Sequence, residues 1–114
     1  MLKKENRLSS NFEFNITRKH GNKVSHELFD IFYLEPDNYQ GSVKIGIVTS
    51  NRLAKKAVER NRIKRVFREA VRPHITELPK NLWIVIHPKV NSLSENYEKI
   101  SISLDQVLQK IYLS

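Results

Sequence analysis

The region between residues 43 and 87 constrains the fold most, because two short apolar segments flank one long segment without glycine or proline. Residues 43–49 and 82–87 are rich in aliphatic and β-branched side chains, as buried strands are. The segment between them, from residue 54 or 55 to residue 71, is predicted to be a helix that ends before Pro73. A strand, a helix and a second strand predict a crossover between neighbours in one sheet. Residues 43–49 are expected to form a central strand.

Two further helices and one further strand are predicted around this crossover. Ser10 lies three residues before Glu13, which is the spacing of a capping box. A short helix is therefore expected over residues 11–18, closed by Gly21. Residues 28–34 have the composition of a strand. The C-terminal segment has apolar residues at helical spacing, and Ser92 or Ser94 is its candidate N-cap. These apolar residues are Ile100, Leu104, Val107, Leu108 and Ile111.

Together these elements predict an α/β fold, a single-domain two-layer sandwich with one central sheet and three helices. Residues 1–114 are expected to form this one domain, preceded over residues 1–8 by a basic N-terminal arm. No apolar run approaches the roughly 20 residues that span a bilayer. The chain has no cysteine, which fits a reducing compartment, so a cytoplasmic location is expected.

The predicted long helix is divided into an apolar face and a cationic face. At about 100° per residue, Arg60, Lys64 and Arg68 lie within roughly 80° of one another. Asn61, Arg65 and Arg72 extend this cationic face, and the apolar stripe lies opposite, at Ile63, Val66, Phe67 and Ala70. Rigid spacing of guanidinium groups suits the phosphates of a polyanion.

A solvated helix face is the simpler interpretation of a charged stretch. Such a face normally mixes signs, because opposite charges at i,i+4 stabilise helices. Between Arg52 and Arg72, however, nine Lys and Arg residues face only Glu59 and Glu69. The whole chain has 20 Lys and Arg against 12 Asp and Glu, a net charge of +8. Both observations favour nucleic acid as the partner.

Catalytic and metal sites find no support in the sequence. The four histidines, at positions 20, 26, 74 and 87, are scattered and form no metal-binding motif. No acidic cluster typical of a nuclease, phosphate-cradling glycine loop or serine elbow is present. We therefore predict no catalytic residue, no metal ligand and no cofactor bound by the protein alone.

The stretch KIGIVTSNRLAKKAVERNRIKRVFREAVR, at residues 44–72, resembles the signature of the bacterial ribonuclease P protein component. Its core is ERNRIKR, at residues 59–65, followed by Arg68, Glu69 and Arg72. The start LKKENRLSSNFEF resembles the N-terminal arm and first helix of this family. LWIVIHPK and the amphipathic C-terminal end resemble its last central strand and final helix.

This resemblance implies a subunit that assists a catalytic RNA in removing the 5′ leader of precursor tRNA. The expected partners are that RNA and the leader, with Mg²⁺ held in the RNA-containing holoenzyme. Neither a membrane nor DNA is an expected partner. The resemblance also implies a left-handed βαβ crossover, whereas general rules favour a right-handed one.

The family's functional residues carry over at matching positions. The RNA-binding set is Arg52, Lys55, Lys56, Arg60, Asn61, Arg62, Lys64, Arg65, Arg68 and Arg72, of which residues 60–62 are the RNR core. The leader-binding set, in a cleft between the sheet and the first helix, is Phe14, Arg18, Phe32 and Lys89. Aromatic rings beside cations suit single-stranded RNA. Core packing is the alternative role for Phe14 and Phe32.

Four positions depart from the family pattern. Asn51 stands where a basic residue is usual, and Arg18 occupies the place of a second aromatic residue. Asp30 puts a negative charge near Phe32, and Pro88 precedes Lys89, the usual basic residue after the last strand. These departures affect the expected strength of leader binding.

Three other functions remain open at this point. A general RNA-binding protein of the ribosomal or chaperone type would share the basic helix. It would not prefer precursor over mature tRNA. A DNA-binding protein would need a helix-turn-helix partner for that helix. A stand-alone nuclease would need clustered acids or histidines.

Overall fold

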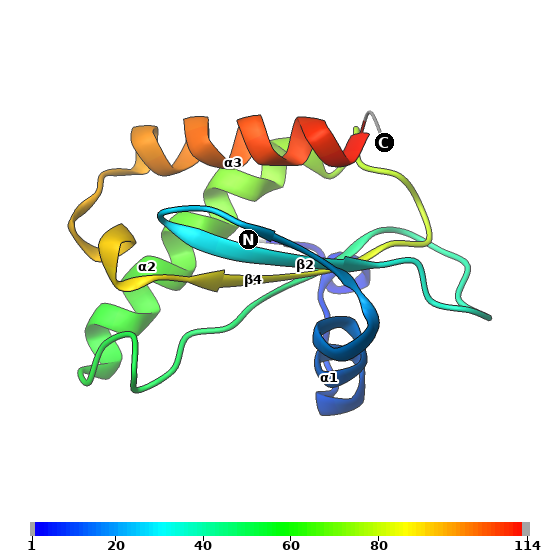
Figure 1. Ribbon diagram of the computed structural model, residues 1–114, viewed down its shortest axis with the longest axis horizontal. Coiled ribbons are helices and arrows are strands. Elements are labelled where there is room, and N and C mark those ends of the chain that lie inside the picture. The colour runs from blue at the N-terminus through cyan, green and yellow to red at the C-terminus, as the bar shows by residue number, and fades with distance from the viewer. Residues whose placement is uncertain (1, 113–114) are drawn as a thin grey trace.

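The computed structural model describes residues 2–112 and, within them, one four-stranded sheet with three α-helices (Figure 1). The α-helices are α1 (Asn11–His20), α2 (Ala57–Val71) and α3 (Tyr97–Tyr112). The strands are β1 (Asn22–Ser25), β2 (Phe29–Leu34), β3 (Lys44–Ile47) and β4 (Trp83–Pro88). Short 3-10 helices cover Lys4–Asn6, Arg72–His74 and Val90–Ser94. The predicted fold class is confirmed.

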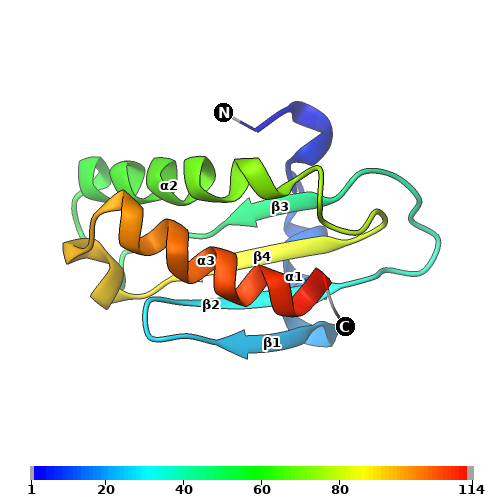
Figure 2. The same ribbon diagram turned by 90° about the horizontal axis from the view of Figure 1, so that it is seen from above.

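The sheet has the strand order β1-β2-β4-β3. β2 pairs antiparallel with β1 on one side and with β4 on the other, and β3 pairs parallel with β4. The chain passes from β3 through α2 to β4, and this crossover is left-handed, as Figure 2 shows with α3 in front of the sheet. The expectation from family resemblance is therefore confirmed, and the general right-handed rule is not followed.

The main hydrophobic core lies between the sheet and the layer formed by α2 and α3. Alternate residues of the strands point into it, including Ile31 of β2 and Ile84 of β4, both fully buried. Ile63 and Phe67 of α2 meet this layer on the predicted apolar stripe. The stripe fixes the rotation of α2, so the charged face of the helix is turned away from the core.

β3 lies at an edge of the sheet, so the prediction of a central strand for this segment is wrong. The N-terminal arm covers that edge instead. Leu8 donates its backbone N–H to the carbonyl of Ile45 at 3.2 Å, and Asn6 Nδ2 donates to the carbonyl of Val43 at 2.9 Å. The apolar sequence of β3 reflects burial by the arm and by helices, not a second neighbouring strand.

α1 lies against the opposite face of the sheet, where it contacts β2 and β4 (Figure 1). Its predicted capping box is present. The Ser10 hydroxyl accepts the backbone N–H of Glu13 at 3.1 Å, and the Glu13 carboxylate accepts the N–H of Ser10 at 3.2 Å. The helix runs two residues beyond the predicted end, to His20, with Gly21 as its C-cap.

Removing this cap should weaken the fold by a measurable amount. Ser10→Ala is expected to cost about 1 kcal/mol of unfolding free energy, because the backbone N–H of Glu13 loses its acceptor. Urea unfolding measures this loss. Ser25→Ala, at an exposed position of β1, is the control and should stay within about 0.5 kcal/mol of the wild type. Equal stability of the two variants would contradict a stabilising role for the cap.

Two helix starts differ from the prediction. α2 begins at Ala57, two to three residues late, because residues 50–54 form a turn in which Leu53 and Ala54 donate to the carbonyl of Ser50. α3 is capped by Asn96, whose side chain accepts the N–H of Lys99 at 2.9 Å. Ser92 and Ser94 lie in the preceding 3-10 helix, so the prediction that one of them caps α3 is wrong.

Across residues 2–112, none of the helices is long and apolar enough to cross a membrane.

Candidate nucleic-acid interface

The cationic face of α2 is present as predicted. Lys64 and Arg68 are partly exposed, Arg65 is exposed, and within the described chain none of these three is paired with a carboxylate. Arg72 is exposed but pairs with Glu69 at 3.1 Å. Arg60, Lys64 and Arg68, which we call the cationic row, are held by the buried stripe behind them.

Two arginines of the RNR core also hold neighbouring segments in place. Arg60 Nη1 donates to the carbonyls of Ala54 at 2.8 Å and Lys55 at 2.7 Å. Arg62 Nη2 donates to the carbonyl of Leu93 at 2.9 Å, in the 3-10 helix before α3. Arg60 therefore fixes the turn that leads into α2, and Arg62 faces away from the cationic row. Between them, Asn61 is exposed.

The turn held by Arg60 carries three of the predicted RNA-binding residues. Arg52, Lys55 and Lys56 are all exposed in the segment before α2. Their side chains extend the positive surface beyond the N-terminus of the helix. The structure thus brings these three residues next to the cationic row.

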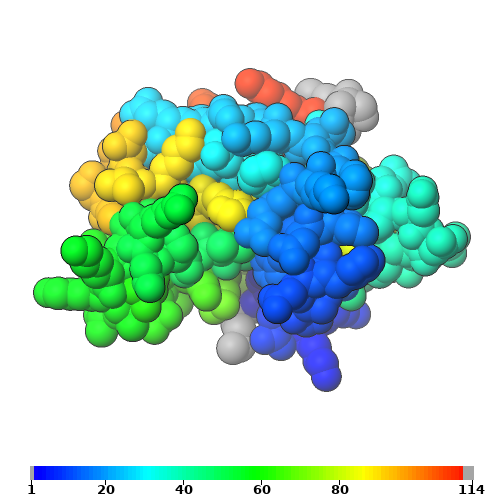
Figure 3. All heavy atoms as spheres, turned by 60° about the horizontal axis from the view of Figure 1, so that its bottom comes forward, coloured from blue at the N-terminus to red at the C-terminus, as the bar shows by residue number. Residues whose placement is uncertain are grey.

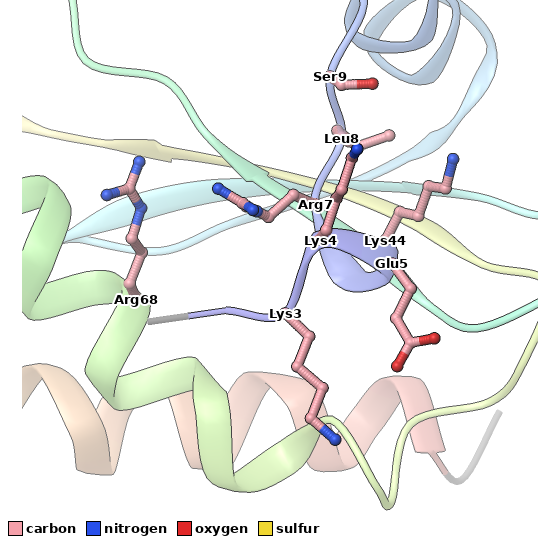
Figure 4. Close-up of a pocket in the computed structure, with 8 residues that line it drawn as sticks. All are labelled: Lys3, Lys4, Glu5, Arg7, Leu8, Ser9, Lys44 and Arg68. Carbon is pink, nitrogen blue, oxygen red and sulfur yellow. The ribbon is translucent and has the colours of Figure 1, made fainter.

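The N-terminal arm adds a second group of cations, which meets α2 at Arg68. A depression of about 950 Å³ lies between them (Figure 4), and we call it the arm depression. In Figure 4, Arg7 extends toward Arg68, whereas Lys3 points away. The cations that line the depression are Lys3, Lys4, Arg7, Lys44 and Arg68. Lys44 was not predicted, because only the fold brings β3 to this place.

Lys44 is held by Glu13 of α1, at 3.3 Å between Nζ and Oε2. Burial raises the pKa of Glu13. The backbone N–H groups of Ser9 and Ser10 and the Lys44 ammonium outweigh that effect and lower the pKa. Because the pKa of Glu13 is lowered, the contribution of its ionised carboxylate to stability is present above the ordinary carboxyl pKa. It is lost as pH falls through the lowered value. The pair therefore fixes α1 to β3 at neutral pH.

The second predicted surface lies on the sheet face beside α1. Phe14, Phe32 and Val48 are partly exposed and pack around the buried Val85. With His87 they form what we call the aromatic face. Figure 3 shows this side, with α1 in blue and the segment before α2 in green. Phe14 and Phe32 are thus neither fully buried nor free of packing.

Gly46 allows the Phe14 ring to lie against β3. A Cβ atom at position 46 would stand 2.3 Å from the ring, closer than any side chain tolerates. A small depression of about 210 Å³ opens here, and Phe14, Lys64 and Arg68 are among the residues that line it. The aromatic face and the cationic row therefore meet at Gly46.

Asp30, which departs from the family pattern, has its negative charge offset by two lysines that the sheet brings close. Asp30 Oδ1 lies 3.3 Å from Lys89 Nζ, and Oδ2 lies 3.9 Å from Lys23 Nζ. Lys23 also stands 5.6 Å above the centroid of the Phe32 ring. The other departure, Arg18, donates to the side chain of Asn15 at 2.6 Å. Arg18, Lys23 and Lys89 thus add positive charge around the aromatic rings.

The arrangement can bind a polyanion. No group of three or more His, Asp or Glu residues that could hold a metal ion occurs within the described part of the chain. Buried hydrophobic residues anchor the cations, and partly exposed rings lie beside them. Such a combination suits the phosphates and the unpaired bases of a nucleic acid.

Comparison with known proteins agrees with this geometry. A match to the family Ribonuclease P covers residues 2–112. The ribonuclease P protein component of Finegoldia magna is 34% identical, over 96% of this chain and 93% of its own. That of Bacillus velezensis is 31% identical, over 98% of this chain and 94% of its own.

Solved structures of the same kind share the fold. The RNase P protein of Staphylococcus aureus superimposes with a TM-score of 0.82 at 26% identity, covering 96% of this chain and 99% of that one. The RNase P protein of Thermotoga maritima gives 0.78 at 26% identity, covering 92% and 96%. The chain therefore belongs to the ribonuclease P protein family. It is a subunit of the endonuclease that processes the 5′ end of tRNA, and its partner is the ribonuclease P RNA.

Proposed function

We propose that this subunit binds the 5′ leader of precursor tRNA on the aromatic face while the cationic row and the N-terminal arm bind the catalytic RNA. The observation that carries the proposal is the junction at Gly46, where Phe14 and the cations of α2 line one depression. A single RNA strand that leaves the catalytic core along α2 would pass directly onto the rings.

The chemistry of the two surfaces supports this division. Partly exposed rings suit unpaired bases, which stack without regard to sequence, and the surrounding Arg18, Lys23 and Lys89 suit the phosphates between them. The row on α2 consists of fixed cations without rings, which suits the backbone of a folded RNA. In this proposal the protein acts in the cytoplasm, and the magnesium ions of the reaction belong to the catalytic RNA.

Leader recognition is tested by Phe14→Ala in the reconstituted holoenzyme. Two precursor tRNAs, one with a long leader and one with a single leader nucleotide, compete in the same reaction. The ratio of their kcat/KM values reports the contribution of the leader. Loss of one stacking contact, about 1–3 kcal/mol, predicts that the preference for the long leader falls by roughly 5-fold or more.

Phe12→Ala is the matched control, because Phe12 lies on the same helix but 65% exposed and outside the aromatic face. It should leave the preference unchanged. If the wild type showed no preference for the long leader, leader binding by this chain would be refuted, and general RNA binding would be the better description. If the wild type preferred the long leader and Phe14→Ala kept that preference, Phe14 would be a packing residue.

A further inference from the structure

Asp30 and His87 are directly paired across β2 and β4, on the aromatic face. Each has a buried polar atom without a hydrogen-bond partner among the described residues. These atoms are Asp30 Oδ1 and His87 Nε2. Asp30 Oδ1 is within ion-pair distance of Lys89 but accepts no hydrogen bond. Asp30 thus has an acceptor that lacks a donor, and its cross-strand neighbour His87 carries hydrogen on both ring nitrogens once the imidazole is protonated.

His87 is surrounded by more positive than negative charge. It packs edge-on against Phe32, with ring centroids 5.5 Å apart. Burial lowers the pKa of His87, and the charges of Arg18 from α1 and Lys23 from β1 lower it further, while Asp30 opposes them. The imidazole is therefore neutral in the free chain at neutral pH.

A leader phosphate changes this balance. Lys23 and Lys89 are the cations nearest Asp30, and their side chains are 52% and 41% exposed, so a phosphate on the aromatic face can recruit them. The Asp30 carboxylate, 20% exposed, would then lose its counter-charges. An unpaired and largely buried carboxylate is costly, so another positive charge becomes favourable beside it.

We propose that His87 takes up a proton from solvent when the leader binds, and that it replaces Lys23 and Lys89 as the partner of Asp30. The inference rests on the proposed leader site. Proton uptake at Nε2 supplies the donor that Asp30 Oδ1 lacks, and it frees two lysines for the leader phosphates. His87 is in this account a positioning residue of the leader site.

The sign of the pH dependence follows from this coupling. Binding raises the pKa of His87, so the complex binds more protons than the free subunit. Leader affinity then rises as pH falls through the pKa of the complex, and it levels off below the pKa of the free chain. One coupled proton allows at most about a tenfold change per pH unit within that window.

The kcat/KM ratio for long-leader and one-nucleotide-leader substrates, measured from pH 5.5 to pH 8, tests the proposal in the holoenzyme. The pH dependence of bond cleavage is common to both substrates and cancels in the ratio. The wild-type preference for the long leader should rise several-fold as pH falls. His87→Gln, which cannot take up a proton, should give a flat preference.

Asp30→Asn distinguishes coupling between leader binding and protonation of His87 from a simple contact between His87 and the leader. Without the carboxylate the lysines are already free, so preference for the long leader should be high at pH 8 and independent of pH. A pH-dependent preference that persists in His87→Gln would overturn the inference. A wild-type preference that does not change with pH would also overturn it and would leave leader binding itself intact. Absence of any preference at all would instead refute the proposed function.

A spectroscopic readout covers the case in which a variant folds poorly. The imidazole signals of the wild-type chain, titrated by NMR with and without a leader-length single-stranded RNA, give the pKa of His87 directly. The RNA should raise the pKa of His87. An unchanged pKa of His87 in the bound chain would contradict proton uptake.

Discussion

Phe67→Ala is expected to destabilise the protein by about 3–5 kcal/mol, the usual cost of removing a fully buried phenyl ring. Phe67 is completely buried on α2 and meets Phe29 of β2 edge-on, with centroids 5.8 Å apart. A domain of this size has a total stability of about 5–15 kcal/mol. The variant should therefore be close to unfolding, and urea denaturation monitored by circular dichroism measures the loss.

The same substitution should also remove RNA binding, since Phe67 belongs to the stripe that fixes the rotation of α2 and so the direction of the cationic row. Phe12→Ala, at a largely exposed ring, is the control and should change stability by less than about 0.5 kcal/mol. A cost below about 1 kcal/mol for Phe67→Ala would mean that the core described between α2 and β2 is not the one that holds the fold.

The double variant Lys64→Ala/Arg68→Ala should give the largest loss of binding to the catalytic RNA with the fold intact. Neither side chain is paired with a carboxylate in the described chain, so their removal leaves no buried charge behind. Each lost phosphate contact lowers the slope of log K against log salt by about one unit. The slope should therefore fall by about two units, as measured by filter binding between low and moderate salt.

A control variant that removes the same amount of positive charge is available on α3. Lys99→Ala/Lys110→Ala removes two exposed lysines from the outer helix, and one of them is only loosely paired, with Glu95 at 3.9 Å. This variant should bind the catalytic RNA with the slope of the wild type. If both double variants lost the same amount of affinity, net charge rather than the placement of the cationic row would explain binding. Arg60 is less suitable for this test, because it also holds the turn before α2.

The division of α2 into two faces was predictable, because helical periodicity is a local property of the sequence. The apolar stripe and the cationic row are both where the 3.6-residue repeat placed them. The capping box of α1 was predictable for the same reason, since Ser10 and Glu13 lie in one turn.

Features that depend on contacts between distant segments were not predictable in this way. β1 has Val24 as its single apolar residue and forms through its pairing with β2. The arm covers the edge of β3, which made a central strand the wrong expectation. Arg62 contacts a carbonyl 31 positions away, so its direction depends on where the segment before α3 lies.

The candidate site also combines features set by local sequence with features that depend on contacts between distant segments. The cations of α2 were found from the sequence, but the addition of Lys44 and the arm required the fold. Asp30 looked unfavourable for leader binding on sequence grounds. The sheet register places it beside His87 and within reach of Lys23 and Lys89, and so gives it partners.

Site-specific cross-linking tests most directly whether α2 is the helix that faces the RNA. The chain contains no cysteine, so Arg65→Cys on α2 and Ile102→Cys on α3 each provide one unique attachment point for a photoreactive group. Both positions are exposed. In the reconstituted holoenzyme, the label at position 65 should cross-link to the catalytic RNA and the label at position 102 should not. Cross-links from position 102 alone would contradict this account of how the protein binds its RNA.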